Sequence, residues 1–68
     1  MARRLRMLGT TSEDGKCPTL YEDLDTGEVL VQGLLADRED IAQMVHPLSG
    51  ESMVVVPRDL LTRFAPKE

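Results

Sequence analysis

Cysteine and aromatic residues are scarce in this chain of 68 residues, which has one Cys, one Tyr, one Phe and no Trp. One cysteine cannot form an intrachain disulfide, and no cluster of Cys and His residues is present to hold a metal ion. A domain of this size gains only about a few kcal/mol from its core. Oligomerisation or a folded partner would therefore add stability, and the core must rest on Leu, Val, Met and Ile.

Long apolar runs are absent as well. No apolar stretch approaches the ~20 residues that cross a bilayer, so we expect no membrane association. The basic start, MARRLRML, is followed by neither an apolar signal region nor a cleavage site, so we expect no secretory leader. The lone thiol and the lack of a targeting segment favour the cytoplasm.

Positive charge is concentrated at the start of the chain. Residues 1–16 carry four basic and two acidic side chains, whereas residues 17–68 carry four and ten. An acidic body binds nucleic acid poorly, so the candidate phosphate contacts are in the basic N-terminal arm. They are Arg3, Arg4 and Arg6. No aromatic residues interleave with them for base stacking, so a solubilising terminus is the favoured explanation.

Residues 19–36, TLYEDLDTGEVLVQGLLA, predict two antiparallel strands joined by a tight turn. Asp25-Thr26-Gly27 supplies a type I turn followed by glycine at the position that needs a positive φ. We expect a three-residue loop that places Leu24 opposite Glu28. The second strand, residues 29–35, is apolar on both faces, which favours a central or partner-shielded position.

An amphipathic pattern after the hairpin predicts a helix over residues 38–46. Asp37 is suited to the N-cap, and acidic residues follow in the first turn, where they meet the positive end of the helix dipole. Pro47 ends the pattern. Apolar residues recur at one-turn spacing and form one face, which consists of Ile41, Met44, Val45 and Leu48.

The remaining segments are assigned from composition. Residues 52–56, SMVVV, are rich in β-branched side chains and predict a third strand. A short closing helix follows, with Pro57 at its first position. The inner side of this helix carries Leu60, Leu61 and Phe64. Residues 9–16 predict a loop, and residues 1–8 predict either an extra edge strand or a disordered arm.

These elements give a small α+β domain of order β-β-α-β-α, with residues 1–8 as the arm or edge strand and residues 9–68 as the domain. A right-handed crossover would make the second and third strands parallel and place the first helix on one sheet face. The other face would keep surplus apolar residues that need a lid. We expect them to form an interface through Leu30, Leu34, Val54 and Val56.

Two acidic patterns in the hairpin suggest chemistry, but a solvated turn explains both. Asp25-Thr26-Gly27 matches the active-site triplet of retroviral-type aspartic proteases. That family has a small residue next, where this chain has Glu28, and an apolar pair with glycine later, where this chain has Pro57 after its valines. Asp23-x-Asp25-x-x-Glu28 lacks the Gly and the twelfth-position Glu of a calcium loop.

Cys17 and His46 are the one combination of a nucleophile and a base. They lie far apart in sequence, and His46 has an adequate structural role at a helix C-terminus. We therefore predict no catalytic, cofactor or metal site, and no enzymatic activity.

Several short motifs carry a resemblance to a known group. They are the Cys-Pro entry at residues 17–18, Val-Gln-Gly at 31–33, a helix with Ala42-Gln43, and the closing Val-Pro-x-x-Leu-Leu at 56–61. The chain resembles small actinobacterial proteins that are encoded beside helix-turn-helix transcriptional regulators and mostly lack an assigned activity. The resemblance covers residues 9–64 and departs at the arginine-rich start.

The resemblance implies an accessory role, in which the protein binds a regulator or itself. It supplies no functional residues to carry over. We expect a non-enzymatic protein-interaction module without a cofactor, accessory to a helix-turn-helix regulator and self-associating as a homodimer. The alternative is a nucleic-acid-binding protein that uses the basic N-terminal arm.

Overall fold

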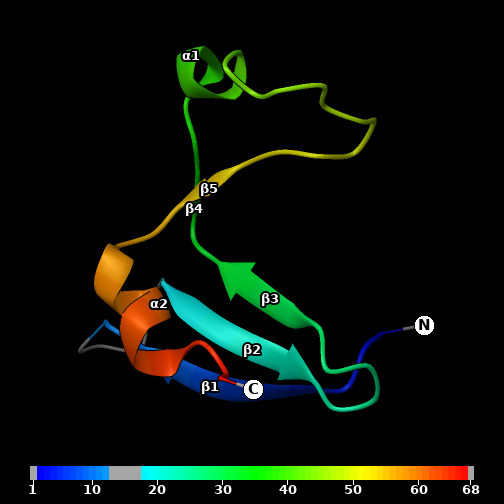
Figure 1. The fold of residues 1–68 in the computed structure, drawn as a ribbon, viewed down its shortest axis with the longest axis vertical. Coiled ribbons are helices and arrows are strands. Elements are labelled where there is room, and N and C mark those ends of the chain that lie inside the picture. Colours follow the sequence, from blue (N-terminus) through cyan, green and yellow to red (C-terminus); the bar gives the residue numbers. More distant parts are fainter. Residues whose placement is uncertain (1, 13–17, 68) are drawn as a thin grey trace.

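A computed structural model describes residues 2–12 and 18–67 and has an α+β fold (Figure 1). Five strands and two helices follow one another within these residues. In chain order they are β1 (Leu5–Thr10), β2 (Thr19–Asp23), β3 (Val29–Gln32), β4 (Leu34–Leu35), α1 (Arg38–Ile41), β5 (Val54–Val55) and α2 (Arg58–Phe64). Part of the predicted loop over residues 9–16, and Cys17, lie outside the described residues.

β1, β2 and β3 form an antiparallel sheet in that order. Of the two alternatives for residues 1–8, the edge strand is the one observed, since Leu5 pairs with Asp23 and Arg6 with Glu22. β1 bulges between Met7 and Gly9 and continues to Thr10. The predicted loop therefore begins too early, because Gly9 and Thr10 belong to the strand.

The turn between β2 and β3 has its glycine where the sequence predicts it, and Gly27 has a φ of 79°. The predicted register is wrong by one residue. Asp23, not Leu24, lies opposite Glu28, and the Asp23 N–H donates to the Glu28 carbonyl at 2.8 Å. Asp23 closes a four-residue loop because its carboxylate accepts from the N–H groups of Asp25 (2.8 Å) and Thr26 (3.2 Å).

β4 and β5 form a separate antiparallel pair, in which Leu34 lies opposite Val55 and Leu35 opposite Val54. The predicted parallel third strand is therefore wrong. A parallel crossover needs a dozen or more residues, usually with a full helix packed on the sheet. Here the connection folds back on itself, and the chain returns beside the strand that it has just left (Figure 1).

α1 is much shorter than the predicted helix over residues 38–46. Asp37 is its N-cap by backbone geometry but makes no side-chain cap hydrogen bond. The helix gives way to single turns after Ile41, and His46 has a φ of 50°. The second half of the apolar stripe is open to solvent, since Val45 is 82% exposed and Leu48 70%. A short helix with little packing is marginal in water.

The core lies between α2 and the sheet. Leu20 on β2 and Leu60 on α2 are the two apolar residues with no exposed surface among those described. Phe64, one turn beyond Leu60, is half-buried above Gly9, whereas Leu61 faces solvent. The helix that covers the sheet is therefore α2, on β1 and β2, and not the first helix as expected from the sequence.

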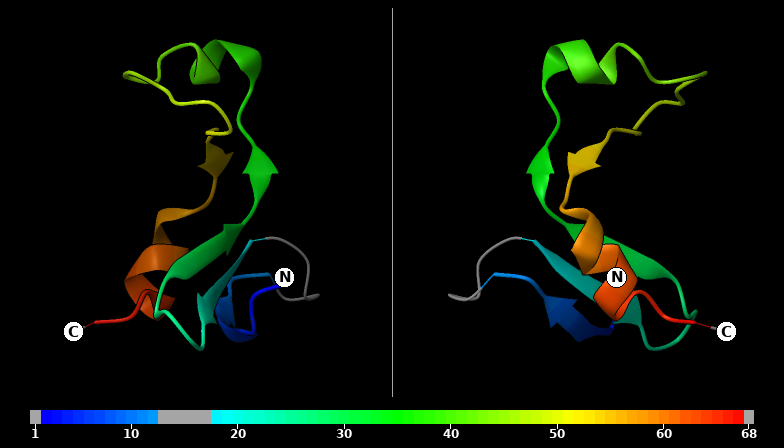
Figure 2. Two further views of the ribbon diagram at one scale, coloured as in Figure 1. Left: turned by 90° about the vertical axis from the view of Figure 1, so that its right-hand side faces the viewer. Right: turned by 60° about the vertical axis from the view of Figure 1, so that its left-hand side comes forward.

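The structure divides into a body and a protruding part. β1, β2, β3 and α2 form the body, and we call residues 34–56 the β4–β5 lobe, which rises away from it (Figures 1 and 2). The radius of gyration is 13.2 Å, whereas a compact chain of this length has about 10.9 Å. The chain is thus less compact than is usual for its length, because the lobe extends away from the body.

The contact between Gly9 and Phe64 predicts a specific steric limit. A Cβ atom at Gly9 would lie 2.2–2.5 Å from three atoms of the Phe64 ring. Gly9→Ala should therefore lower the free energy of unfolding by about 1–3 kcal/mol, as overpacking does. Urea unfolding measures this change. In a Phe64→Ala background the same substitution should have a much smaller effect, and an equal effect in both backgrounds would contradict the contact.

β1 also makes the first residues part of the folded body. Deleting residues 1–6 removes the start of β1 and the arginines that precede it. We expect a lower thermal unfolding midpoint by circular dichroism, because the sheet loses ladder hydrogen bonds. A full-length variant with Arg3, Arg4 and Arg6 replaced by Gln separates the charges from the strand. An unchanged midpoint in the deletion would show that β1 contributes nothing to stability.

Candidate interaction surface

The three arginines of the N-terminal arm each bind carboxylates of the hairpin. Arg3 donates to Asp23 at 2.6 Å and to Glu28 at 2.8 Å. Arg4 makes a two-pronged ion pair with Asp25, and Arg6 pairs with Glu22 across the β1–β2 ladder. A phosphate group would have to displace these carboxylates. The arrangement thus supports a structural role for all three arginines.

Asp23 is the most buried carboxylate in this network, with 4% of its surface exposed. Its pKa lies below the ordinary value of 3.8, first because the Asp25 N–H donates to the carboxylate. The Thr26 N–H and Arg3 lower the pKa further, while burial opposes the shift. The pKa of Glu28 is also lowered, chiefly by the hydrogen bond from Arg3. The turn is therefore built around ionised carboxylates.

Apolar side chains are exposed over most of the β4–β5 lobe. Leu34 is 74% exposed, and its strand neighbour Leu35 is nearly as open. The lobe also exposes Val45, Leu48, Met53, Val54 and Val55. Scattered exposed apolar residues are ordinary, but a contiguous group on one small lobe is typical of an interaction site.

The predicted interface residues Leu30, Leu34, Val54 and Val56 are not on one face. Residues directly opposite each other in an antiparallel pair share a face, so Leu34 shares its face with Val55. Val54 lies with Leu35 on the other face. Leu30 belongs to the body, opposite Tyr21. Leu34 and Val54 are exposed, whereas Leu30 and Val56 are partly covered.

β2 and β5 meet beside the same stretch of chain. At one end of residues 28–36, the Asp23 N–H donates to the Glu28 carbonyl. At the other end, the Ala36 N–H donates to the Met53 carbonyl. β2 pairs with β3 as far as Gln32, and β5 pairs with β4 from Leu34, so the two pairings meet at Gly33, which belongs to neither strand. Continued by one residue, the two registers bring both Pro18 and Val56 toward Gly33. β2 therefore begins where β5 ends.

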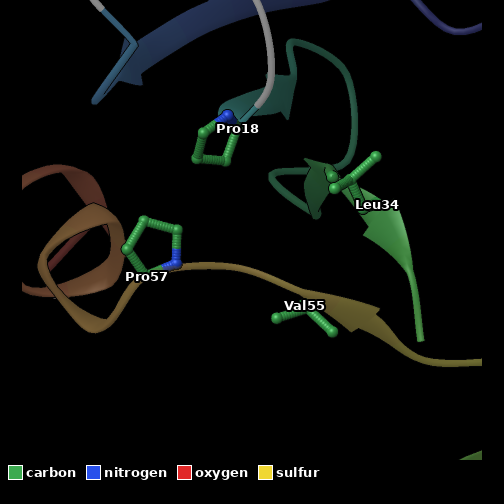
Figure 3. Close-up of a pocket in the computed structure, with 5 residues that line it drawn as sticks. Pro18, Leu34, Val55 and Pro57 are labelled. Carbon is green, nitrogen blue, oxygen red and sulfur yellow. The ribbon is translucent and has the colours of Figure 1, made fainter. Parts of the chain in front are cut away.

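A small pocket marks this junction (Figure 3). It has a volume of about 180 Å³ and is lined by Pro18, Gly33, Leu34, Val55 and Pro57. Pro18 and Pro57 lack an N–H, so neither adds a backbone donor to the junction. A ligand pocket usually measures about 300–1,000 Å³ and has convergent polar groups. This hollow is therefore a packing gap at a strand junction.

The junction leaves no room for a side chain at Gly33. A Cβ atom there would lie 2.9 Å from the Val56 side chain and 3.2 Å from the Val55 carbonyl. The sequence motif Val-Gln-Gly at residues 31–33 thus has a structural explanation in this fold. The glycine allows β5 to approach the strand closely.

The weak chemical patterns acquire structural roles. Asp25 is exposed in the turn and paired with Arg4, and the acidic residues Asp23 and Glu28 are bound by Arg3. Within residues 2–12 and 18–67, no group of three His, Cys, Asp or Glu side chains is arranged to bind a metal ion. His46 is exposed, and its expected companion Cys17 lies outside the described residues.

Comparison with known proteins gives no relative. No protein family, curated protein or solved structure matches the chain significantly. In the part of the chain that the structure describes, neither helix has the length and apolar character of a membrane span.

The lowered pKa values of Asp23 and Glu28 predict loss of stability in acid. A carboxylate with a lowered folded-state pKa stabilises the fold above its unfolded pKa, and this contribution is lost as the pH falls through the folded value. We expect urea midpoints to fall as the pH is lowered below about 4. Asp23→Asn should weaken this dependence. Asp59→Asn on α2 is the matched control, and an equal effect of both substitutions would contradict the assignment.

Proposed function

We propose that this protein is a non-enzymatic interaction module that self-associates and serves a helix-turn-helix transcriptional regulator as an accessory. The observation that carries the proposal is the exposed apolar surface of the β4–β5 lobe. The regulator is proposed only from the resemblance in sequence. The pocket at the strand junction is small and lacks convergent polar groups, so it does not support a ligand-binding function.

The exposed area supports an interaction surface. The chain exposes 5757 Å², whereas a folded monomer of its mass exposes about 4,300 Å². A standard protein interface buries about 800 Å² on each partner. The surplus is therefore large enough for one interface. Burying it would stabilise a body that has two fully buried apolar residues among those described, Leu20 and Leu60.

The charge distribution supports a protein partner over nucleic acid. The arginines of the N-terminal arm already neutralise carboxylates of the hairpin. The remaining body and lobe are acidic, and an acidic surface repels phosphate. A regulator partner would therefore be contacted through its protein surface.

Sedimentation equilibrium tests self-association. We expect the wild type to be larger than its monomer mass of 7.6 kDa at high micromolar concentration. Leu34→Asp and Val54→Asp should each shift the equilibrium toward monomer, since both place a charge on an exposed apolar surface. Ser52→Asp adds the same charge nearby and is the control. A wild type that stays monomeric throughout would reject the homodimer.

A further inference from the structure

The helix α2 is joined to the sheet that it covers only through the β4–β5 lobe. The chain leaves the body after Gly33 and returns to it at Pro57 (Figure 1). Leu60 then packs with no exposed surface, and Phe64 lies above Gly9. We call this arrangement, with α2 on the sheet of its own chain, the closed chain. A second copy of the chain supplies the same sheet and the same helix.

The return of the chain depends on a fold-back between residues 46 and 50. His46 has a φ of 50° and is the one non-glycine residue with a positive φ among those described. Gly50, at the other end of the fold-back, has a φ of 88°. A side chain is disfavoured in this left-handed conformation, so His46 stores strain in the closed chain. Opening the fold-back would release that strain.

The segment before the fold-back contains a helical pattern that the closed chain leaves unused. Ile41, Met44, Val45 and Leu48 recur at one-turn spacing. Yet α1 ends at Ile41, and Val45 and Leu48 are exposed. A short helix persists only when its apolar face is packed. The same stripe on a second copy would provide that packing.

We propose that two copies of the chain exchange β5 and α2, so that α2 of each copy packs on β1 and β2 of the other. This inference rests on the proposed self-association and names how the two chains are joined. Exchange of an identical element is a low-cost route to a dimer, because the contacts of the closed chain are remade between the copies. The sheet receives the same Leu60 and Phe64, and β4 pairs with β5 of the second copy.

The dimer gains a contact that the closed chain lacks. Residues 37–52 of the two copies cross between the bodies, side by side about the twofold axis. Without the fold-back, His46 takes a negative φ and α1 extends as far as Pro47 allows. The apolar stripes of the two helices cover each other, so the new interface lies between the two lobes. Burial of the stripes and release of the strain offset the entropy lost on association.

Alanine at Gly50 tests the fold-back. It strains the closed chain and should strengthen the dimer about tenfold or more in sedimentation equilibrium, since two chains are affected. Gly27→Ala is the matched control, because Gly27 has a φ of 79° but lies in the hairpin, which is the same in both forms. A Cβ atom at either glycine would have no atom within 4 Å. Equal effects of the two substitutions on the dimer would overturn the exchange.

His46 provides a test in both directions. His46→Gly removes the strain from the closed chain and weakens the extended helix, so it should weaken the dimer about tenfold. His46→Val should strengthen the dimer, because a β-branched residue is strongly disfavoured at positive φ while its helix propensity is similar to that of histidine. A dimer that responds to neither substitution would contradict the opening of the fold-back.

A disulfide across β4 and β5 distinguishes exchange from other dimers. Leu35 lies opposite Val54 in a non-hydrogen-bonded pair, since the Ala36 N–H donates to Met53 in the next pair. Cysteines at both positions can therefore be bridged. In a Cys17→Ser background, the Leu35→Cys/Val54→Cys chain should oxidise to a covalent dimer, seen on a non-reducing denaturing gel. Neither single-cysteine variant should do so.

The outcomes separate the exchange from the self-association. Intrachain disulfides alone, in a sample that sediments as a dimer, would overturn the exchange and leave the self-association standing. A wild type that stays monomeric would overturn the self-association and the exchange with it. Circular dichroism checks that the variants fold, and the disulfide decides even if a fold-back variant does not.

Discussion

Two strands pair with consecutive parts of one stretch of chain, residues 29–36, and this limits the rest of the fold. β2 occupies the first half and β5 the second, and both registers run toward Gly33. Proline on each side of the junction avoids stranded N–H groups, and glycine opposite them makes room for the Val56 side chain. Because β5 must leave the strand there, the chain continues directly into α2 and returns to the body.

The body combines a small apolar core with a network of charges at its hairpin end. Leu60 and Phe64 of α2 pack against the sheet. At the turn end of the hairpin, three arginines form ion pairs with four carboxylates. Exposed ion pairs each contribute little. Asp23 differs because it is buried and also accepts two backbone N–H groups. It is therefore both the end of a strand and the anchor of a turn.

Local signals in the sequence predict the parts of the fold that local chemistry decides. Gly27 in the hairpin turn and a closing helix with Leu60 and Phe64 inside are examples. The length of α1 could not be predicted, because its apolar stripe has the right spacing but no surface to cover. The strand β1 gives a weak signal since its arginines pair with distant carboxylates. The position of β5 depends on where the connection between β4 and β5 folds back, and no short sequence pattern predicts that point.

The apolar residues proposed as an interface were chosen by composition, but which of them share a face is decided by the register of β4 and β5. Leu34 and Val54 lie on opposite faces of the β4–β5 pair, because Leu34 lies opposite Val55 and Val54 lies opposite Leu35.

The contact of Phe64 with Gly9 joins segments near opposite ends of the sequence. During synthesis, at about 5–20 residues per second, the hairpin emerges for some time before the helix that completes its core. The contact between Gly9 and Phe64 therefore cannot form until α2 has been synthesised. The body is completed by the last helix of the chain.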